Sequence, residues 1–325
     1  MDRLSLISHF GSQHDIAQDK LMKTKTLILN LSALSIMASL TEAATLRYRA
    51  SGNWSAITDG ASPGWGPNPN GVGTSLPGAA DDARINFGNN TVTVDSAVPE
   101  VSRVQIGVDE SGTVLVADGG VLTSGLDILA GNNNPAATGT LTVQSGGEVN
   151  VGRILWAANN GSDGVINIES GGVVNVANHL WLGVTGTANI TISGTLNQTG
   201  GILGLGTSDA SSASGGTATV SIGDGGLFAL NNISGAVGLP WIQAGSIIDL
   251  TGSGRLTVNN DQVGTLNDYI DADKITGDGL AGGVNLNVSF DSDANLTTGS
   301  VIPEPSSVLL GSLALCLGLF VRRKS

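Results

Sequence analysis

The sequence predicts an all-β protein whose central part is a parallel β-helix, or β-solenoid. Glycine is abundant, with 48 residues in 325, whereas charged residues make up 13% and aromatic residues 4% of the chain. This composition suits many short strands and tight turns more than the helices of a typical enzyme. Short runs in which aliphatic and polar residues alternate also recur at a nearly fixed spacing, as in repeat architectures.

The repeat is clearest between positions 141 and 181. The run from Leu141 to Trp156 and the run from Ile166 to Trp181 share apolar positions, a Gly-Gly pair and the final Trp at one constant offset. Weaker copies of the pattern begin at Val114, Ile190, Val220 and Ile248. One coil cannot bury its own apolar face, so we expect coils to stack about 4.8 Å apart around a column of Val, Ile and Leu.

An antiparallel meander that closes into a sandwich is the competing interpretation, because it uses the same strand and turn residues. Matched side chains at a fixed offset favour the solenoid, since hairpins do not require them. The repeats are also similar to the passenger repeats of autotransporter-like surface proteins in their Gly-Gly turns and their alternation.

The chain divides into five predicted segments. They are a signal peptide (1–44), an N-terminal β cap (45–110), the solenoid repeats (111–260), a C-terminal cap and tether (261–300) and a C-terminal membrane segment (301–325). The caps should shield the open ends of the array. In the C-terminal cap, Val263, Leu266 and Ile270 have helical spacing and predict a short helix. A strand follows at 284–290, and 291–302 has the composition of a polar tether.

The N-terminal segment has the pattern of a secretory signal peptide. Lysines precede a short apolar run, residues 27–40, and small residues follow at Ala43 and Ala44, where we expect cleavage. The run predicts a signal helix, because it is too short and too rich in Ser to span a membrane. Residues 1–21 are unlike a basic leader, so we expect Met22 to be the true start.

The C-terminal segment has three parts in a fixed order. Two prolines flank a glutamate, an apolar run extends from Val308 to Val321, and a basic end follows. A helix rises about 1.5 Å per residue, so this run with the two preceding serines covers roughly 24 Å, somewhat less than the roughly 30 Å of a bilayer core. It predicts a single transmembrane helix. The basic end should stay on the cytoplasmic side, with the rest of the chain outside.

These residues resemble the PEP-CTERM sorting signal in motif, apolar length, basic end and terminal position. The resemblance covers only the end of the chain, from Val301 to Ser325. The matching residues are Pro303, Glu304 and Pro305 in the motif and Arg322, Arg323 and Lys324 as the membrane stop. The resemblance implies recognition and cleavage by an exosortase, a membrane transpeptidase with a cysteine nucleophile. An ordinary, permanent C-terminal anchor is the alternative.

The resemblance also implies a destination. Proteins with this tail are exported through the inner membrane of Gram-negative bacteria, anchored transiently, and found at the cell surface or in a matrix that contains exopolysaccharide. It implies nothing about the activity of residues 45–302, which we call the body.

Charge and cysteine usage narrow the functions of the body. Residues 45–302 contain seven Lys and Arg against 22 Asp and Glu, a net charge of −15, which argues against binding of nucleic acid or anionic lipid. The single cysteine, Cys316, lies in the C-terminal apolar run. The body therefore has neither a disulfide nor a thiol nucleophile.

No motif in the body predicts catalysis, a metal site or a cofactor. Five aspartates between 261 and 278 do not have EF-hand spacing. Asp81 and Asp82, with Asp59 or Asp95, offer carboxylates for glycoside cleavage, but nothing in the sequence fixes their separation. His179 is the sole histidine after the signal peptide, so a multi-histidine metal site is excluded. We therefore expect a protein that is not an enzyme and needs no cofactor.

Trp156 and Trp181 occupy equivalent positions in two successive repeats. If they face inward, they form a ladder in the core, which is the role we expect. If they face outward, they form an aromatic strip on which sugar rings could stack. The sequence thus predicts a secreted structural protein, with a polysaccharide-binding or polysaccharide-cleaving solenoid as the alternative.

Overall fold

The computed structural model describes residues 43–56, 64–67, 73, 75–208, 215–233 and 241–302. Most of the predicted signal peptide, and the whole motif, membrane helix and basic end from Pro303 onward, lie outside the described residues. Within these ranges, no helix is long and apolar enough to cross a membrane. The described chain from Ala44 onward belongs to one compact unit.

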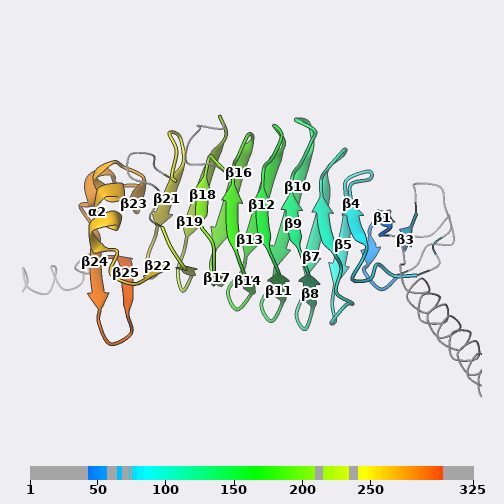
Figure 1. Ribbon diagram of the computed structural model, residues 1–325, viewed down its shortest axis with the longest axis horizontal. Coiled ribbons are helices and arrows are strands. Elements are labelled where there is room, and N and C mark those ends of the chain that lie inside the picture. Colours follow the sequence, from blue (N-terminus) through cyan, green and yellow to red (C-terminus); the bar gives the residue numbers. More distant parts are fainter. Residues whose placement is uncertain are drawn as a thin grey trace, which may run out of the picture. The chain divides into compact units, whose positions relative to one another are not determined.

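The described chain forms a parallel β-solenoid of about seven turns (Figure 1). Its strands make three sheets, which we name A, B and C. Sheet A contains, in the order of neighbours, β18 (Leu203–Leu205), β15 (His179–Leu182), β12 (Ile154–Ala157), β9 (Asp127–Ala130), β6 (Arg103–Ile106), β4 (Asp82–Ile85), β1 (Thr45–Arg49) and β3 (Gly64–Gly66). Sheet B contains β2 (Gly52–Asn53), β5 (Asn90–Val94), β7 (Gly112–Val116), β10 (Thr138–Val143), β13 (Asp163–Ile168), β16 (Thr187–Ile192), β19 (Thr217–Ile222), β21 (Ile247–Leu250) and β23 (Ile275–Gly277). Sheet C contains β24 (Leu286–Asp291), β25 (Leu296–Val301), β22 (Arg255–Asn259), β20 (Leu227–Leu230), β17 (Thr195–Gln198), β14 (Val173–Val176), β11 (Glu148–Val151) and β8 (Val121–Ser124).

The repeat in the sequence is one coil of the solenoid. The coil made by β10, β11 and β12 lies against the coil made by β13, β14 and β15, with parallel pairing in each sheet. Leu141 pairs with Ile166, and Trp156 pairs with Trp181, so the register between the coils equals the offset between the two sequence runs. The predicted parallel β-helix is confirmed, and the antiparallel sandwich is wrong for the array.

A continuous apolar column fills the solenoid. In sheet B the buried residues of eight strands pair one after another, each at most 2% exposed: Val92, Val114, Leu141, Ile166, Ile190, Val220, Ile248 and Ile275. Burial of such a side chain contributes about 1.5–3 kcal/mol, but only if the next coil is in place to cover it. The stack is therefore stable as an array and not coil by coil.

An aromatic cluster covers the N-terminal end. Trp54 and Trp65 are fully buried, with ring centroids 4.6 Å apart, and Tyr48 meets Trp65 edge to face at 5.0 Å. The indole N–H of Trp65 donates to the carbonyl oxygen of Trp54 at 2.7 Å. In the same region β3 pairs antiparallel with β1, so the sheet does not end in an open parallel edge.

The C-terminal end is closed by a helix and a hairpin. The helix expected from the spacing of its apolar residues is α2 (Val263–Asp271), which buries Leu266, Tyr269 and Ile270. The 3₁₀ turn η1 (Ala281–Gly283) leads to β24, and β25 pairs antiparallel with both β24 and β22.

One expectation for this end differs from the structure. The stretch expected to be a polar tether contains β25, whose alternate residues Thr297 and Val301 are buried. Its residues are mostly Thr, Ser and Gly, so the alternation is not visible as apolar against polar. Pairing with β24 and β22 decides that this segment is a strand.

Small residues line one corner of the solenoid. Gly112, Gly139 and Gly164 follow one another in register at the start of their strands. A Cβ on Gly139 would lie 2.0 Å from the nitrogen of Gly131 and 2.2 Å from the carbonyl oxygen of Ile106. The backbone of successive coils therefore leaves no room for a side chain there.

We predict that Gly139→Ala lowers the free energy of unfolding by about 1–3 kcal/mol, because the new methyl group must push two coils apart. The matched control is Gly264→Ala in α2, where a Cβ meets no atom within 4 Å. The control should be neutral or stabilising by up to about 1 kcal/mol. Urea unfolding followed by circular dichroism measures both, and equal midpoints for the two variants would contradict the stacking.

Candidate functional site

The outer face of sheet A carries the most distinctive side chains in the described part of the chain. Residues on its strands alternate between the core and the outside. The outward positions are Thr45, Arg47, Arg49, Asp82, Arg84, Arg103, Gln105, Asp127, Leu129, Ile154, Trp156, His179, Trp181 and Gly204. We call this surface the A face. The A face has two parts: an aromatic part, which contains the tryptophans, and a cationic part, which contains the arginines.

The aromatic part consists of Trp156, Trp181 and His179. The two indoles lie in register on β12 and β15, with ring centroids 4.4 Å apart and an interplanar angle of 81°. The imidazole of His179 stacks on Trp181 at 5.0 Å and 19°. Both tryptophans are half-buried, whereas Leu155 and Leu180 on the same strands are fully buried.

The expectation that the tryptophans form a ladder in the core is therefore wrong. They alternate with the core residues and lie on the outside. On β15, the polar His179 lies on the same side as Trp181 and was the sequence signal for the outside. On β12, by contrast, Ile-Leu-Trp-Ala is apolar at all four positions. A period of two cannot show which pair of residues faces inward when both pairs are apolar. The geometry leaves the sugar-stacking role of these residues as a prediction.

Burial sets the protonation of His179. Its Nδ1 accepts a hydrogen bond from the backbone N–H of Ile202 at 3.2 Å, and desolvation lowers the pKa of the imidazole below its ordinary value. The neutral ring is therefore the favoured form at pH 7, and its hydrogen is on Nε2 because Nδ1 is an acceptor.

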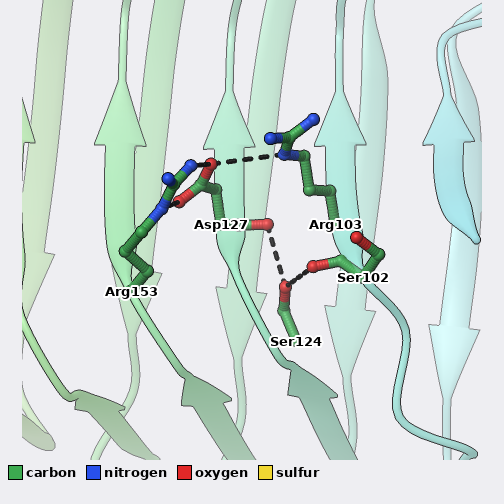
Figure 2. A network of polar contacts seen from close by, with 5 residues as sticks. All are labelled: Ser102, Arg103, Ser124, Asp127 and Arg153. Atoms are coloured by element: carbon green, nitrogen blue, oxygen red, sulfur yellow. Dashed lines mark hydrogen bonds and ion pairs between the residues drawn. The ribbon is translucent and has the colours of Figure 1, made fainter. Parts of the chain in front are cut away.

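The cationic part centres on one aspartate between two arginines, one of which, Arg153, directly precedes β12 (Figure 2). The carboxylate of Asp127, with its side chain 7% exposed, accepts from Nε of Arg153 at 2.8 Å and also from Nη2 of Arg153. Nε of Arg103 approaches the same carboxylate at 3.4 Å from the opposite side. The hydroxyl of Ser124 lies 3.0 Å from the carbonyl oxygens of Ser102 and Asp127.

This network has a net charge of +1, because two guanidinium groups share one carboxylate. The side chain of Arg103 is 38% exposed and that of Arg153 is 44% exposed. The hydrogen bond from Arg153 to Asp127 raises the pKa of that arginine above its ordinary value, so the group stays charged. The three residues come from successive coils, so the pairing also ties those coils together.

Further arginines extend the cationic part toward β1. Arg47 lies 3.9 Å from the carboxylate of Asp109, and Arg84 has a buried Nε without a hydrogen-bond partner in the part of the chain that the structure describes. Arg49 also points outward from β1. Five of the seven cationic residues between 45 and 302 thus belong to the strands of sheet A or, in the case of Arg153, to the residue before β12.

A second feature is a hollow of about 290 Å³ over sheet C, lined by residues that include Thr123, Asn150 and Asn175. The amides here are engaged with one another. Nδ2 of Asn175 donates to Asn150 at 3.0 Å, and Nδ2 of Asn197 donates to Asn175 at 3.2 Å. This ladder ties neighbouring coils together, so its polar groups are already satisfied by the fold.

Two of the acidic residues considered as catalytic candidates, Asp81 and Asp95, have structural partners. The carboxylate of Asp81 accepts from the backbone N–H of Ala44 at 3.0 Å and of Gly78 at 2.9 Å, and Asp95 accepts from the amide of Asn53 at 2.5 Å. Asp59 lies outside the described residues. Among the residues that the structure describes, no group of three His, Cys, Asp or Glu is arranged to hold a metal ion.

Sequence reasoning did not predict the arginine cluster. Arg103, Asp127 and Arg153 follow one another along the chain at intervals of about one coil. A search for charged residues at the period of the repeat would have found them.

The comparisons with known proteins add no relative: no family model matches the chain, and neither a curated protein nor a solved structure is significantly similar to it. What the protein does must therefore be inferred from its own residues.

We predict that Asp127→Ala lowers the free energy of unfolding by about 1–3 kcal/mol, because two arginines lose their shared partner. The cost should stay below that of a fully buried ion pair, since water can reach both guanidinium groups. The matched control is Glu169→Ala at an exposed position, which should change stability by less than about 0.5 kcal/mol. An effect of Asp127→Ala as small as that of the control would contradict the network.

We also predict that the protein loses stability as the pH falls below about 6.5, the ordinary pKa of histidine. The folded state holds His179 at a lowered pKa, so the unfolded chain binds more protons in this range and is favoured by acid. Above this pH the contribution of the neutral ring is fully present.

The measurement compares the pH dependence of urea midpoints on both sides of that pKa for the parent and for His179→Phe, which keeps an aromatic ring against Trp181. His179 is the sole histidine after the predicted signal peptide. The variant should lose part of the pH dependence, whereas parallel curves would show that His179 does not contribute.

Proposed function

We propose that this protein is a secreted structural protein of the cell surface or extracellular matrix, sorted by its C-terminal signal and cleaved there by an exosortase. One observation supports this most. The first strand begins at Thr45, directly after the predicted cleavage site at Ala43 and Ala44, and the last strand ends at Val301, two residues before the motif begins at Pro303. The folded body thus lies between the predicted signal peptide and the predicted sorting signal.

The residues at both ends of the body are exposed, so a processing enzyme could reach the segments next to them. Ala43 and Ala44 are exposed, and Ile302, the last residue before the motif, is 48% exposed. Neither the predicted signal peptide nor the predicted sorting signal is needed to complete the core. The helix α2 and the β24–β25 hairpin close one end of the solenoid, and the aromatic cluster closes the other. Removal of either segment should therefore leave the solenoid intact.

The body suits a structural role outside the cell. It has no cysteine, so its stability does not depend on oxidative folding. Stacked coils with shared hydrogen bonds and a shared core supply the stability in place of disulfides. Because no motif in the sequence of the body predicts catalysis or a metal site, we infer that the body is not an enzyme and binds no cofactor.

Polysaccharide binding on the solenoid scaffold is the second candidate function. The observation that favours it is the outward placement of Trp156 and Trp181, whose rings remain partly accessible. Indole rings combine an apolar surface with a polar N–H and are suited to contact sugars.

We predict that the extracellular form of the parent protein lacks Arg322, Arg323 and Lys324 by intact mass. A double variant, Pro303→Ala with Pro305→Ala, should keep these residues and accumulate in the membrane fraction, because it lacks the two prolines of the motif that the enzyme is expected to recognise. The control is Pro99→Ala, which removes an exposed proline of the body and should be processed like the parent.

Cells without the processing peptidase should accumulate the parent in the membrane. An extracellular form that retains the basic residues would indicate a permanent anchor. Recovery of the whole chain from the cytosol with both ends intact would contradict export.

A further inference from the structure

The distribution of charge separates the A face from the rest of the solenoid. The strands of sheet A carry four arginines against two aspartates, Asp82 and Asp127. The described strands of sheets B and C carry one arginine, Arg255, against four acidic residues, which are Glu148, Asp163, Asp249 and Asp291. The body as a whole has a net charge of −15. A polyanion is therefore repelled by most of this surface and attracted by the A face.

The register of the strands aligns the cationic and aromatic parts along the solenoid. One row of outward residues crosses six neighbouring strands: Arg47, Arg84, Gln105, Leu129, Trp156 and Trp181. With strands about 4.8 Å apart, three strand spacings or roughly 14 Å separate Arg84 from Trp156. A ligand that contacts both parts must be extended and must run across the coils.

We propose that the A face binds an acidic polysaccharide, with its carboxylate or sulfate groups on the arginines and its sugar rings against Trp156 and Trp181. The proposal rests on the second candidate function, polysaccharide binding, and specifies the chemistry of the ligand. Guanidinium groups pair with planar carboxylates through two parallel hydrogen bonds, which makes arginine suited to uronic acids.

The cluster around Asp127 is arranged for such a ligand. Asp127 holds Arg153 through two hydrogen bonds and Arg103 through Nε, so both side chains lose little conformational freedom on binding. The remaining charge of +1 lies on side chains that are 38% and 44% exposed. On the same face, the neutral imidazole of His179 carries its hydrogen on Nε2, a donor suited to a hydroxyl group.

A polysaccharide fits these observations better than a nucleic acid does. The two indoles meet at 81°, so they do not offer two parallel platforms for successive bases.

The test uses the full chain purified in a neutral detergent and immobilised polygalacturonate as the probe, with fully methyl-esterified polygalacturonate as the uncharged match and single-stranded poly(dT) as a competitor. The parent should bind polygalacturonate at least about tenfold more tightly than the methyl ester. Binding should weaken as salt is raised, because exposed ion pairs are screened.

Two sets of variants locate the binding. Arg84→Gln with Arg103→Gln should weaken binding to polygalacturonate about tenfold or more. Arg84→Lys keeps the charge but loses the paired hydrogen bonds, so its affinity should lie between that of Arg84→Gln and that of the parent. Trp156→Ala with Trp181→Ala should weaken binding to a similar extent. The matched control is Arg255→Gln, an exposed arginine of sheet C, which should bind like the parent. A circular dichroism spectrum like that of the parent under the binding conditions excludes unfolding as the cause.

The remaining outcomes oppose the proposal in distinct ways. Equal binding of the methyl ester, lost only in the tryptophan variant, would leave polysaccharide binding in place and overturn its acidic chemistry. Binding of neither polymer would overturn both. Two results would show that binding is only an unspecific attraction of polyanions. One is displacement of the protein from polygalacturonate by an equal mass of poly(dT), and the other is a loss of affinity in Arg255→Gln as large as in the variants of sheet A. None of these results depends on the C-terminal sorting signal.

Discussion

Register between successive coils is the constraint on which the rest of this structure depends. A single coil exposes its aliphatic side chains and leaves the backbone hydrogen-bonding groups of its strands unpaired, so it gains stability only when neighbouring coils cover both. Leu141 covers Val114 and is covered by Ile166, and the same relation continues along sheet B. A shift of one residue would turn every one of these side chains outward. Gly139 and its neighbouring glycines allow the coils to approach closely enough for this pairing.

An array of this kind must end without leaving an edge to which another chain could add. The protein ends it differently on the two sides. At the N-terminal end, Tyr48, Trp54 and Trp65 replace the missing coil with buried aromatic rings, and a short antiparallel strand pairs with β1. At the C-terminal end, α2 and the antiparallel β24–β25 hairpin take over. Both devices come from segments outside the regular repeat.

The same register also aligns the residues of the outer surfaces, whose identity is not restricted by packing in the core. Because outward positions of successive coils lie one above another, any residue that recurs at the period becomes a row. Asn150, Asn175 and Asn197 form such a row on sheet C and bond to one another. On sheet A the rows bring Arg103 and Arg153 to opposite sides of Asp127 and set Trp156 against Trp181. A solenoid thus turns periodicity in the chain into a continuous surface.

The sequence by itself determined the architecture, because the constant offset between repeats, the alternation and the Gly-Gly turns are local patterns that a parallel solenoid requires. The spacing of Val263, Leu266 and Ile270 likewise predicted α2. Only the tertiary structure decided which side of β12 faces outward, since Ile-Leu-Trp-Ala is apolar on both sides. It also decided that 296–301 is a strand, because its partners supply the hydrogen bonds. The grouping of arginines on one face follows from pairing between coils, which brings together residues that lie a whole coil apart in the chain.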